Sequence, residues 1–414
     1  MNKPTVTEGA GSYVLKWDEG VTIDVTRARQ HQSDGRVTGE VAVRFGENGS
    51  TSLLHRAQFN FSSTQARNTL SKALGGRVKE IPWDDALEQM CFSVVDWVRR
   101  GEPVVELWGG EDAKRPEYLA EPLIIKGYPN IIFGDPGSFK SALAALCIAI
   151  VTLPWKRNPL ELPTPDVHTN CLYLDWETDR DTVDWTLARL FKGHQLPPFP
   201  MQYRRCAAPL PSDIEALREL IDDVKAELVV IDSLGMASGG EDLNKSGAAI
   251  GFYTALRQLN VTSLILAHNS KDRESKTRSI IGHQYYTAQA RNIWEAKKVQ
   301  ETGEDEIDLA LFHRKAPPFA KYSAPIGAHV TFTEDSMTLT AQNATTVREF
   351  VADMGLKAQV KDALRDGAMT VKDLADTIDG NQASIKTILN RLRSANLVYH
   401  LPDNRWGLSH REDE

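Results

Sequence analysis

The sequence has 414 residues, of which 41% are hydrophobic and 25% charged, and its formal net charge is −8. This composition is that of a globular protein with room for about three domains, and it excludes a uniformly basic nucleic-acid coat while allowing a local basic channel. The chain starts with polar residues rather than an apolar signal sequence, and its four cysteines are scattered without a metal-binding spacing. We therefore expect a cytoplasmic protein with no membrane segment and no structural zinc.

Residues 1–118 predict an N-terminal α+β domain. Alternating apolar residues indicate strands, and two segments with helical periodicity follow them. No catalytic constellation is visible, so we interpret this domain as a substrate, partner or assembly module. The expected strands are Tyr13–Trp17, Val21–Val25 and Val41–Phe45; one helix is capped by Ser62 or Ser63, and another follows Pro82.

Residues 119–342 predict a second, α/β domain, because strands and helices alternate there. This alternation is typical of a doubly wound or RecA-like parallel sheet. A long polar segment, Arg157–Thr169, is expected to be a loop. The expected strands are Asn130–Phe133, Cys171–Asp175, Glu227–Asp232, Thr262–His268 and Asp308–His313.

The segment Ile131–Ser141 predicts a buried strand, a phosphate-binding loop and the start of a helix. Amides at such a loop point at one place, where the helix dipole also favours negative charge. Lys140 would reach the β- and γ-phosphates, and the Ser141 hydroxyl would bind Mg²⁺. We therefore predict that ATP and Mg²⁺ bind here; the alternative is a glycine-rich turn before a core helix. The predicted nucleotide-binding residues are Gly134, Asp135, Pro136, Gly137, Ser138, Phe139, Lys140 and Ser141.

Phe139 departs from the G-x-x-x-x-G-K-[ST] pattern, because it stands where the second glycine belongs. The position lies at the start of the helix. We therefore expect Phe139 to have ordinary helical dihedrals, with its ring pointing away from the nucleotide.

Three further strands end in polar residues. Asp232 closes the run Leu228–Asp232 and is expected to hold Mg²⁺ together with Ser141. Glu177 follows the strand that ends at Asp175, and we predict that Glu177 is the catalytic base while Asp175 supports it; the alternative is that both cap the next helix. His268, at the end of another strand, is either a γ-phosphate sensor or a structural residue.

Basic residues follow these strands. The charged loop Asp272–Ser279 contains Arg273, Lys276 and Arg278, which either contact a nucleic-acid backbone or simply face solvent. Further along, Arg291, Arg314 and Lys315 are candidates for an arginine finger, a charge donated to a neighbour's γ-phosphate.

Residues 343–414 predict a winged-helix domain, with three helices followed by a hairpin. No acidic residue occurs between Asn381 and Pro402, so the third helix has a local basic character. A recognition helix with a wing indicates duplex DNA binding, although winged helices also dock proteins. The expected helices are Val360–Asp366, Thr370–Ile378 and Ala383–Ala395, and the candidate DNA-binding residues are Lys386, Arg391, Arg393 and Arg405.

Taken together, the region from about Tyr118 to Leu339 resembles the RecA-like ATPases of the plasmid RepA and DnaB helicase class. The resemblance implies a ring, expected to be a hexamer, with ATP at subunit interfaces and single-stranded DNA through its centre. It also implies Glu177 as the catalytic base and His268 at the sensor position. The matching segments are Gly134–Ser141, Leu172–Glu177, Val230–Leu234 and Ala267–Lys271, followed by Gly282, Ala290–Arg291 and Arg314–Lys315.

The leading functional hypothesis is an ATP-hydrolysing, DNA-dependent motor, a replicative-type helicase of a phage or plasmid. One alternative is an ATPase switch that loads or regulates replication or recombination proteins without moving along DNA. Another is a winged-helix regulator whose ATPase fold only senses nucleotide. The presence of Lys140, Glu177 and Asp232 together argues against a pure sensor, which has no need of the base.

Overall fold

The computed structural model describes residues 1–9, 12–31, 34–46, 52–100, 106, 108–110, 113–239, 243–270 and 280–409. The predicted basic loop Asp272–Ser279, with Arg273, Lys276 and Arg278, lies outside these residues. The chain divides into two compact units, Met1–Ala113 and Lys114–Glu414.

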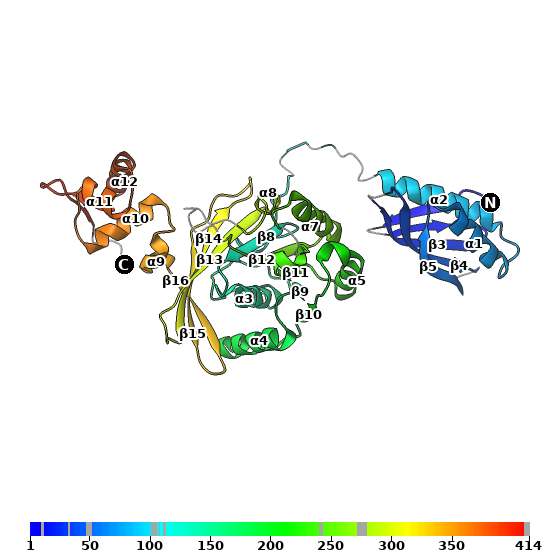
Figure 1. The fold of residues 1–414 in the computed structure, drawn as a ribbon, viewed down its shortest axis with the longest axis horizontal. Helices are drawn as coiled ribbons and strands as arrows, with labels where there is room; N and C mark the ends of the chain where they lie inside the picture. The colour runs from blue at the N-terminus through cyan, green and yellow to red at the C-terminus, as the bar shows by residue number, and fades with distance from the viewer. Residues whose placement is uncertain are drawn as a thin grey trace. The chain divides into compact units, whose positions relative to one another are not determined.

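The first unit is a five-stranded antiparallel meander whose strands lie in sequence order, followed by two helices (Figure 1). Alternate strand residues such as Leu15, Ile23 and Val43 are buried in one core with Leu87 and Val94 of the second helix. Two strands are longer than the sequence predicted, and the first and last strands of the sheet were missed. The elements are β1 Thr5–Gly9, β2 Ser12–Lys16, β3 Val21–Gln30, β4 Val37–Phe45, β5 Ser52–Asn60, α1 Thr64–Gly75 and α2 Trp83–Arg100.

Ser63, one of the two predicted caps, begins α1, since its side chain accepts a hydrogen bond from the Ala66 amide.

The second unit is built on a nine-stranded mixed sheet with the order β10-β9-β11-β12-β8-β13-β14-β15-β16. The first six strands in this order are parallel, and the last three are antiparallel. The prediction of a wholly parallel sheet was therefore wrong for Asp308–His313, which lies in the antiparallel β14. The strands are β8 Pro129–Gly134, β9 Cys171–Asp175, β10 Gln202–Arg205, β11 Leu228–Asp232, β12 Thr262–His268, β13 Asn292–Val299, β14 Glu306–Lys315, β15 Ile326–Phe332 and β16 Met337–Gln342, with a separate hairpin of β6 Tyr118–Ala120 and β7 Ile124–Ile125.

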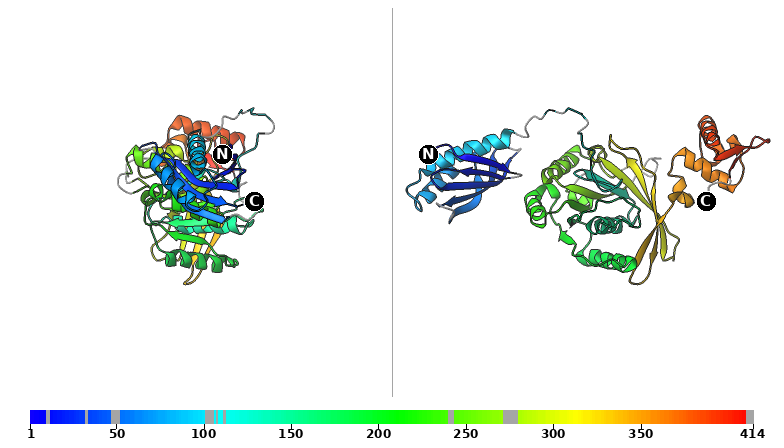
Figure 2. Two further views of the ribbon diagram at one scale, coloured as in Figure 1. Left: turned by 90° about the vertical axis from the view of Figure 1, so that its right-hand side faces the viewer. Right: turned by 180° about the vertical axis from the view of Figure 1, so that it is seen from behind.

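Helices cover both faces of the parallel part of this sheet (Figure 1). One core joins the sheet to α3 and α4, and another joins its opposite face to α5 and α7. Figure 2 shows the antiparallel strands, in yellow and orange, at one end of the sheet, where α4 packs against β16. The helices are α3 Lys140–Thr152, α4 Arg180–His194, η1 Leu210–Ser212, α5 Ile214–Val224, α6 Leu234–Ala237, α7 Ser246–Leu259 and α8 Tyr285–Gln289.

The helix α3 is apolar on all sides, and the structure explains why. From Leu143 to Thr152 every residue is buried, because the helix packs between the sheet, α4 and β6. The predicted loop Arg157–Thr169 contains neither helix nor strand.

The last part of the chain forms short helices and a hairpin around a small core of its own. A capping box starts the helix that was expected over Thr370–Ile378, since the side chains of Thr370 and Asp373 exchange hydrogen bonds with each other's backbone amides. The assignment of this part as a winged helix stays a prediction. Its elements are η2 Ala344–Thr346, α9 Arg348–Val351, α10 Leu356–Ala363, η3 Leu364–Asp366, α11 Val371–Thr377, α12 Gln382–Ser394, β17 Val398–His400 and β18 Trp406–Leu408.

Candidate active site

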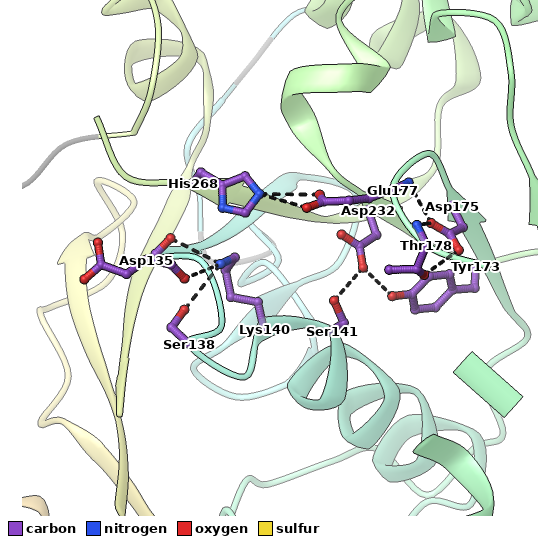
Figure 3. A network of polar contacts seen from close by, with 11 residues as sticks. Asp135, Ser138, Lys140, Ser141, Tyr173, Asp175, Glu177, Thr178, Asp232 and His268 are labelled. Atoms are coloured by element: carbon purple, nitrogen blue, oxygen red, sulfur yellow. Dashed lines mark hydrogen bonds and ion pairs between the residues drawn. The ribbon is translucent and has the colours of Figure 1, made fainter. Parts of the chain in front are cut away.

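The predicted site lies at the carboxyl edge of the parallel strands, where β8 meets the start of α3 (Figure 3). Gly134 ends β8, and a Cβ atom at this position would lie 2.4 Å from the Ala296 carbonyl oxygen and 2.6 Å from the Ser138 hydroxyl. Gly137 has a φ of +74°, which a side chain would strain. Glycine is therefore required at Gly134 for close packing and favoured at Gly137 by its backbone conformation.

Phe139 does not have the ordinary helical dihedrals that the sequence predicted. Its φ is 71° and its ψ 13°, the left-handed conformation that glycine adopts without cost. The prediction was wrong because closure between β8 and α3, rather than helix propensity, sets this φ. The ring packs into the core of the α3 face and meets Phe332 edge-on, with centroids 6.1 Å apart. Packing of the phenyl ring thus stabilises the strained, left-handed backbone conformation of Phe139.

This strain predicts an unusual order of stability for two substitutions. Phe139→Gly and Phe139→Ala both remove the ring, so the difference between them reports the backbone alone. Because φ is positive, we expect Phe139→Gly to unfold at a higher temperature and to be about 1 kcal/mol more stable than Phe139→Ala. Thermal unfolding of both proteins measures this difference; a more stable alanine variant would mean that the position is an ordinary helix start.

Lys140 is folded back onto the phosphate-binding loop. Its Nζ donates to the carbonyl oxygens of Gly134 (3.2 Å) and Asp135 (2.9 Å) and to the Ser138 hydroxyl (3.3 Å). Burial lowers the pKa of Lys140, and the nearby carboxylates of Glu177 and Asp232 oppose this shift. An ammonium group held only by neutral oxygens within its own loop can exchange them for phosphate oxygens.

Ser141 and Asp232 form the predicted metal pair. The Ser141 hydroxyl donates to Asp232 Oδ2 at 2.7 Å, and the Tyr173 hydroxyl donates to the same oxygen at 2.6 Å. Asp232 is 3% exposed, and burial raises its pKa while both hydrogen bonds oppose that rise. Tyr173 was missed by the sequence analysis; the available signal was a hydroxyl two residues before Asp175, on the same face of a buried strand.

Glu177 and His268 are brought together from the ends of β9 and β12, which lie on either side of β11 in the sheet. His268 Nε2 lies 3.2 Å from Glu177 Oε1, and this contact, partly opposed by burial, lowers the pKa of Glu177 to about 2. The alternative in which Glu177 and Asp175 cap α4 does not hold, because Asp179 is the cap, accepting from the Thr182 amide at 2.9 Å.

Asp175 instead holds the turn that carries Glu177. Its Oδ1 accepts from the amides of Glu177 (2.9 Å) and Thr178 (2.8 Å). Its Oδ2 accepts from the hydroxyls of Thr178 and Tyr203, each at 2.8 Å. Burial acts to raise the pKa of Asp175, but the hydrogen bonds, led by those from Thr178, lower it on balance.

The chemistry of these groups fits a nucleotide with Mg²⁺. A hydroxyl and a carboxylate are hard oxygen ligands of the kind that Mg²⁺ prefers. Two polar atoms beside the loop, His268 Nδ1 and Asn269 Oδ1, are buried without a hydrogen-bond partner among the described residues. The Asn269 amide nitrogen donates to Asp135 Oδ1 at 2.8 Å, which ties the end of β12 to the loop.

The three arginine-finger candidates differ in what they already bind. Arg314 forms an ion pair with the buried Glu295, with nitrogen–oxygen distances of 2.6 and 2.8 Å. Lys315 donates to three backbone carbonyl groups at and beyond the end of α8, at 2.7–2.9 Å. The Arg291 side chain is exposed and makes no polar contact with the described part of the chain. The assignment of an arginine finger among these three residues stays a prediction.

The candidate DNA-binding residues also divide into two kinds. Lys386, Arg391 and Arg393 are exposed on α12, and helical spacing puts Lys386 and Arg393 on one side and Arg391 on another. Arg405 pairs with Asp403 at 2.6 Å, which offsets its charge.

The four cysteines are buried and unpaired. Over the ranges that the structure describes, no helix combines the length and the apolar character needed to cross a membrane.

Comparisons with known proteins support the nucleotide site. A family model described as an AAA domain matches residues 100–274. No curated protein matches the chain. Similar solved structures include a KaiC-like protein from the hyperthermophilic archaeon Pyrococcus horikoshii, with 12% identity and a TM-score of 0.37, covering 54% of this chain and 98% of that protein.

The matched region contains the phosphate-binding loop, Glu177, Asp232 and His268. In the sheet order, β12 lies between the loop strand β8 and the Asp232 strand β11. The second unit thus contains a P-loop ATPase core of the RecA-like type.

Proposed function

We propose that this protein is a DNA-dependent motor that uses the energy of ATP hydrolysis to move along DNA. The motor would be a ring-shaped replicative-type helicase of a phage or plasmid. One observation carries the ATPase part of the proposal. Lys140, Ser141 and Asp232 meet at one edge of the sheet, with Glu177 held beside them by His268. A pure nucleotide sensor has no need of the base.

In the proposed reaction the chain's own groups bind and orient the substrate. The amides of the loop and the start of α3 would receive the phosphates of ATP, and Lys140 would turn from the loop carbonyls to the β- and γ-phosphates. Magnesium bound by Ser141 and Asp232 would neutralise charge developing on the phosphate oxygens.

Glu177 would orient the attacking water and accept its proton. With a pKa of about 2, Glu177 is a weak base while His268 holds it. Loosening of the Glu177–His268 contact when ATP binds would therefore raise the basicity of Glu177. The same movement would carry the state of the γ-phosphate to the segment that follows β12.

DNA binding and ring assembly are further parts of the proposal. Exposed Lys386, Arg391 and Arg393 on α12 support contact with a nucleic-acid backbone. Arg291 is exposed and has no side-chain partner among the described residues, which supports a subunit interface in which a neighbour's ATP receives an arginine. A homohexamer in the cytoplasm, with single-stranded DNA through its centre, fits both features.

The alternative is an ATPase switch that loads or regulates replication or recombination proteins. The Glu177–His268 contact favours it, because a base held in reserve suits slow, triggered hydrolysis. Both functions would use the same site, and they differ in whether single strands drive turnover and whether duplex DNA is unwound.

The deciding measurement is the steady-state ATPase rate of the full chain with and without single-stranded DNA, using Lys140→Ala as the blank. We expect single strands to raise the rate at least about tenfold, as an electrostatically bound activator does, and the rise to shrink with added salt. A rate indifferent to DNA would support the switch. Stimulated hydrolysis without strand displacement would also exclude the helicase.

A further inference from the structure

Two tyrosines lie side by side on the α3 face of the sheet, next to the active site. Tyr173 is in β9 and Tyr203 is its direct partner in the parallel strand β10. Their rings are stacked, with centroids 6.2 Å apart. Each hydroxyl donates to a different carboxylate, Tyr173 to Asp232 and Tyr203 to Asp175.

The Tyr173 hydroxyl fixes the carboxylate of the metal pair. Tyr173 is fully buried, and its hydroxyl lies 2.6 Å from Asp232 Oδ2. The other donor to this oxygen is Ser141, whose hydroxyl is itself a predicted metal ligand. Tyr173 is thus the donor that can keep Asp232 in place when Ser141 turns to the metal.

The Tyr203 hydroxyl acts on a different part of the site. It donates to Asp175 Oδ2, while Asp175 Oδ1 accepts from the amides of Glu177 and Thr178. Asp175 and Asp232 are direct partners in the parallel strands β9 and β11. The two tyrosines therefore serve neighbouring carboxylates with different tasks.

We propose that Tyr173 and Tyr203 are positioning residues with separate roles in the ATPase site. Tyr173 orients Asp232 toward the magnesium ion, and Tyr203 orients Asp175 and, through it, the turn that carries Glu177. This inference rests on the proposed ATPase function and adds two residues to it. Each residue acts through a hydrogen bond to a carboxylate rather than by touching the substrate.

The matched variants Tyr173→Phe and Tyr203→Phe test this division, because each deletes one hydroxyl and keeps both rings. For Tyr173→Phe we expect the Mg²⁺ concentration that half-saturates binding of a fluorescent ATP analogue to rise about tenfold. Turnover at saturating Mg²⁺ should stay within about twofold of the unaltered protein, because the Glu177 turn is intact.

For Tyr203→Phe we expect the opposite pattern. Half-saturation by Mg²⁺ should stay within about twofold, while turnover falls about tenfold because Glu177 is less well placed. Hydrogen exchange of the Glu177 and Thr178 amides, which Asp175 holds, should become faster in this variant and not in Tyr173→Phe. This exchange measurement needs no catalysis.

Thermal unfolding without nucleotide and Mg²⁺ checks that both variants are folded. Equal effects of the two variants on Mg²⁺ dependence, or unchanged exchange in Tyr203→Phe, would overturn the proposed division. If the unaltered protein binds the nucleotide analogue with Mg²⁺ but does not hydrolyse ATP, only the ATPase proposal is overturned. The binding and exchange measurements would then still test the separate roles of the two tyrosines. A lack of any Mg²⁺-dependent binding would overturn both.

Discussion

Lys140→Ala is expected to lower ATP turnover at least about a hundredfold, because it removes the loop ammonium group that would turn to the β- and γ-phosphates. The protein should remain folded. Lys140 is 7% exposed and burial lowers its pKa, so alanine removes a charge that is costly to bury. Steady-state ATPase rates and binding of a fluorescent ATP analogue measure the loss, and thermal unfolding measures the stability.

Lys126→Ala is the matched control. Lys126 pairs with Glu117 on the surface at 3.2 Å, away from the loop, and we expect its removal to leave turnover unchanged. If Lys140→Ala keeps its turnover, another cation must bind the phosphates. That result would contradict the assignment of Lys140 as the phosphate-binding lysine of the P-loop.

Glu177→Gln is expected to bind ATP normally and to lower turnover by about 10²- to 10⁴-fold, the range that a general base contributes. Glutamine keeps the size of the side chain and can still accept a hydrogen bond from His268, so the turn should keep its shape. What it loses is the ability to accept a proton from water. Turnover at saturating ATP and the dissociation constant for ATP separate these two effects.

Asp179→Asn makes the same chemical change two residues further along. Asp179 caps α4, and asparagine caps a helix as well as aspartate does, so both binding and turnover should be preserved. Ordinary turnover by Glu177→Gln, with Asp179→Asn unchanged, would remove Glu177 from the mechanism.

Residues of the candidate site could be predicted where their role depends on a short stretch of sequence. Gly134, Lys140 and Ser141 follow a buried strand and open a helix, so short-range sequence is enough to indicate a phosphate site. Asp232 and His268 end strands of continuous apolar residues, and parallel strands bring such ends to one edge. The capping box of Thr370 and Asp373 depends on only four residues.

Longer-range features of the sheet were not predictable in this way. The antiparallel strands β14, β15 and β16 depend on pairing between segments, and the sequence analysis found only the first and expected it to be parallel. Nor does strand periodicity indicate that β12 separates β8 from β11.

Residue type and spacing along one strand, loop or helix were thus enough to predict which residues form the candidate nucleotide site. How those residues are held follows from the tertiary structure. Closure of the loop gives Phe139 its left-handed conformation, and pairing across the sheet gives Asp232 its Tyr173 partner. The buried Glu295 pairs with Arg314, whereas the Arg291 side chain has no partner among the described residues. Each of these outcomes depends on groups far apart in the chain, whose positions follow from packing rather than from local propensity.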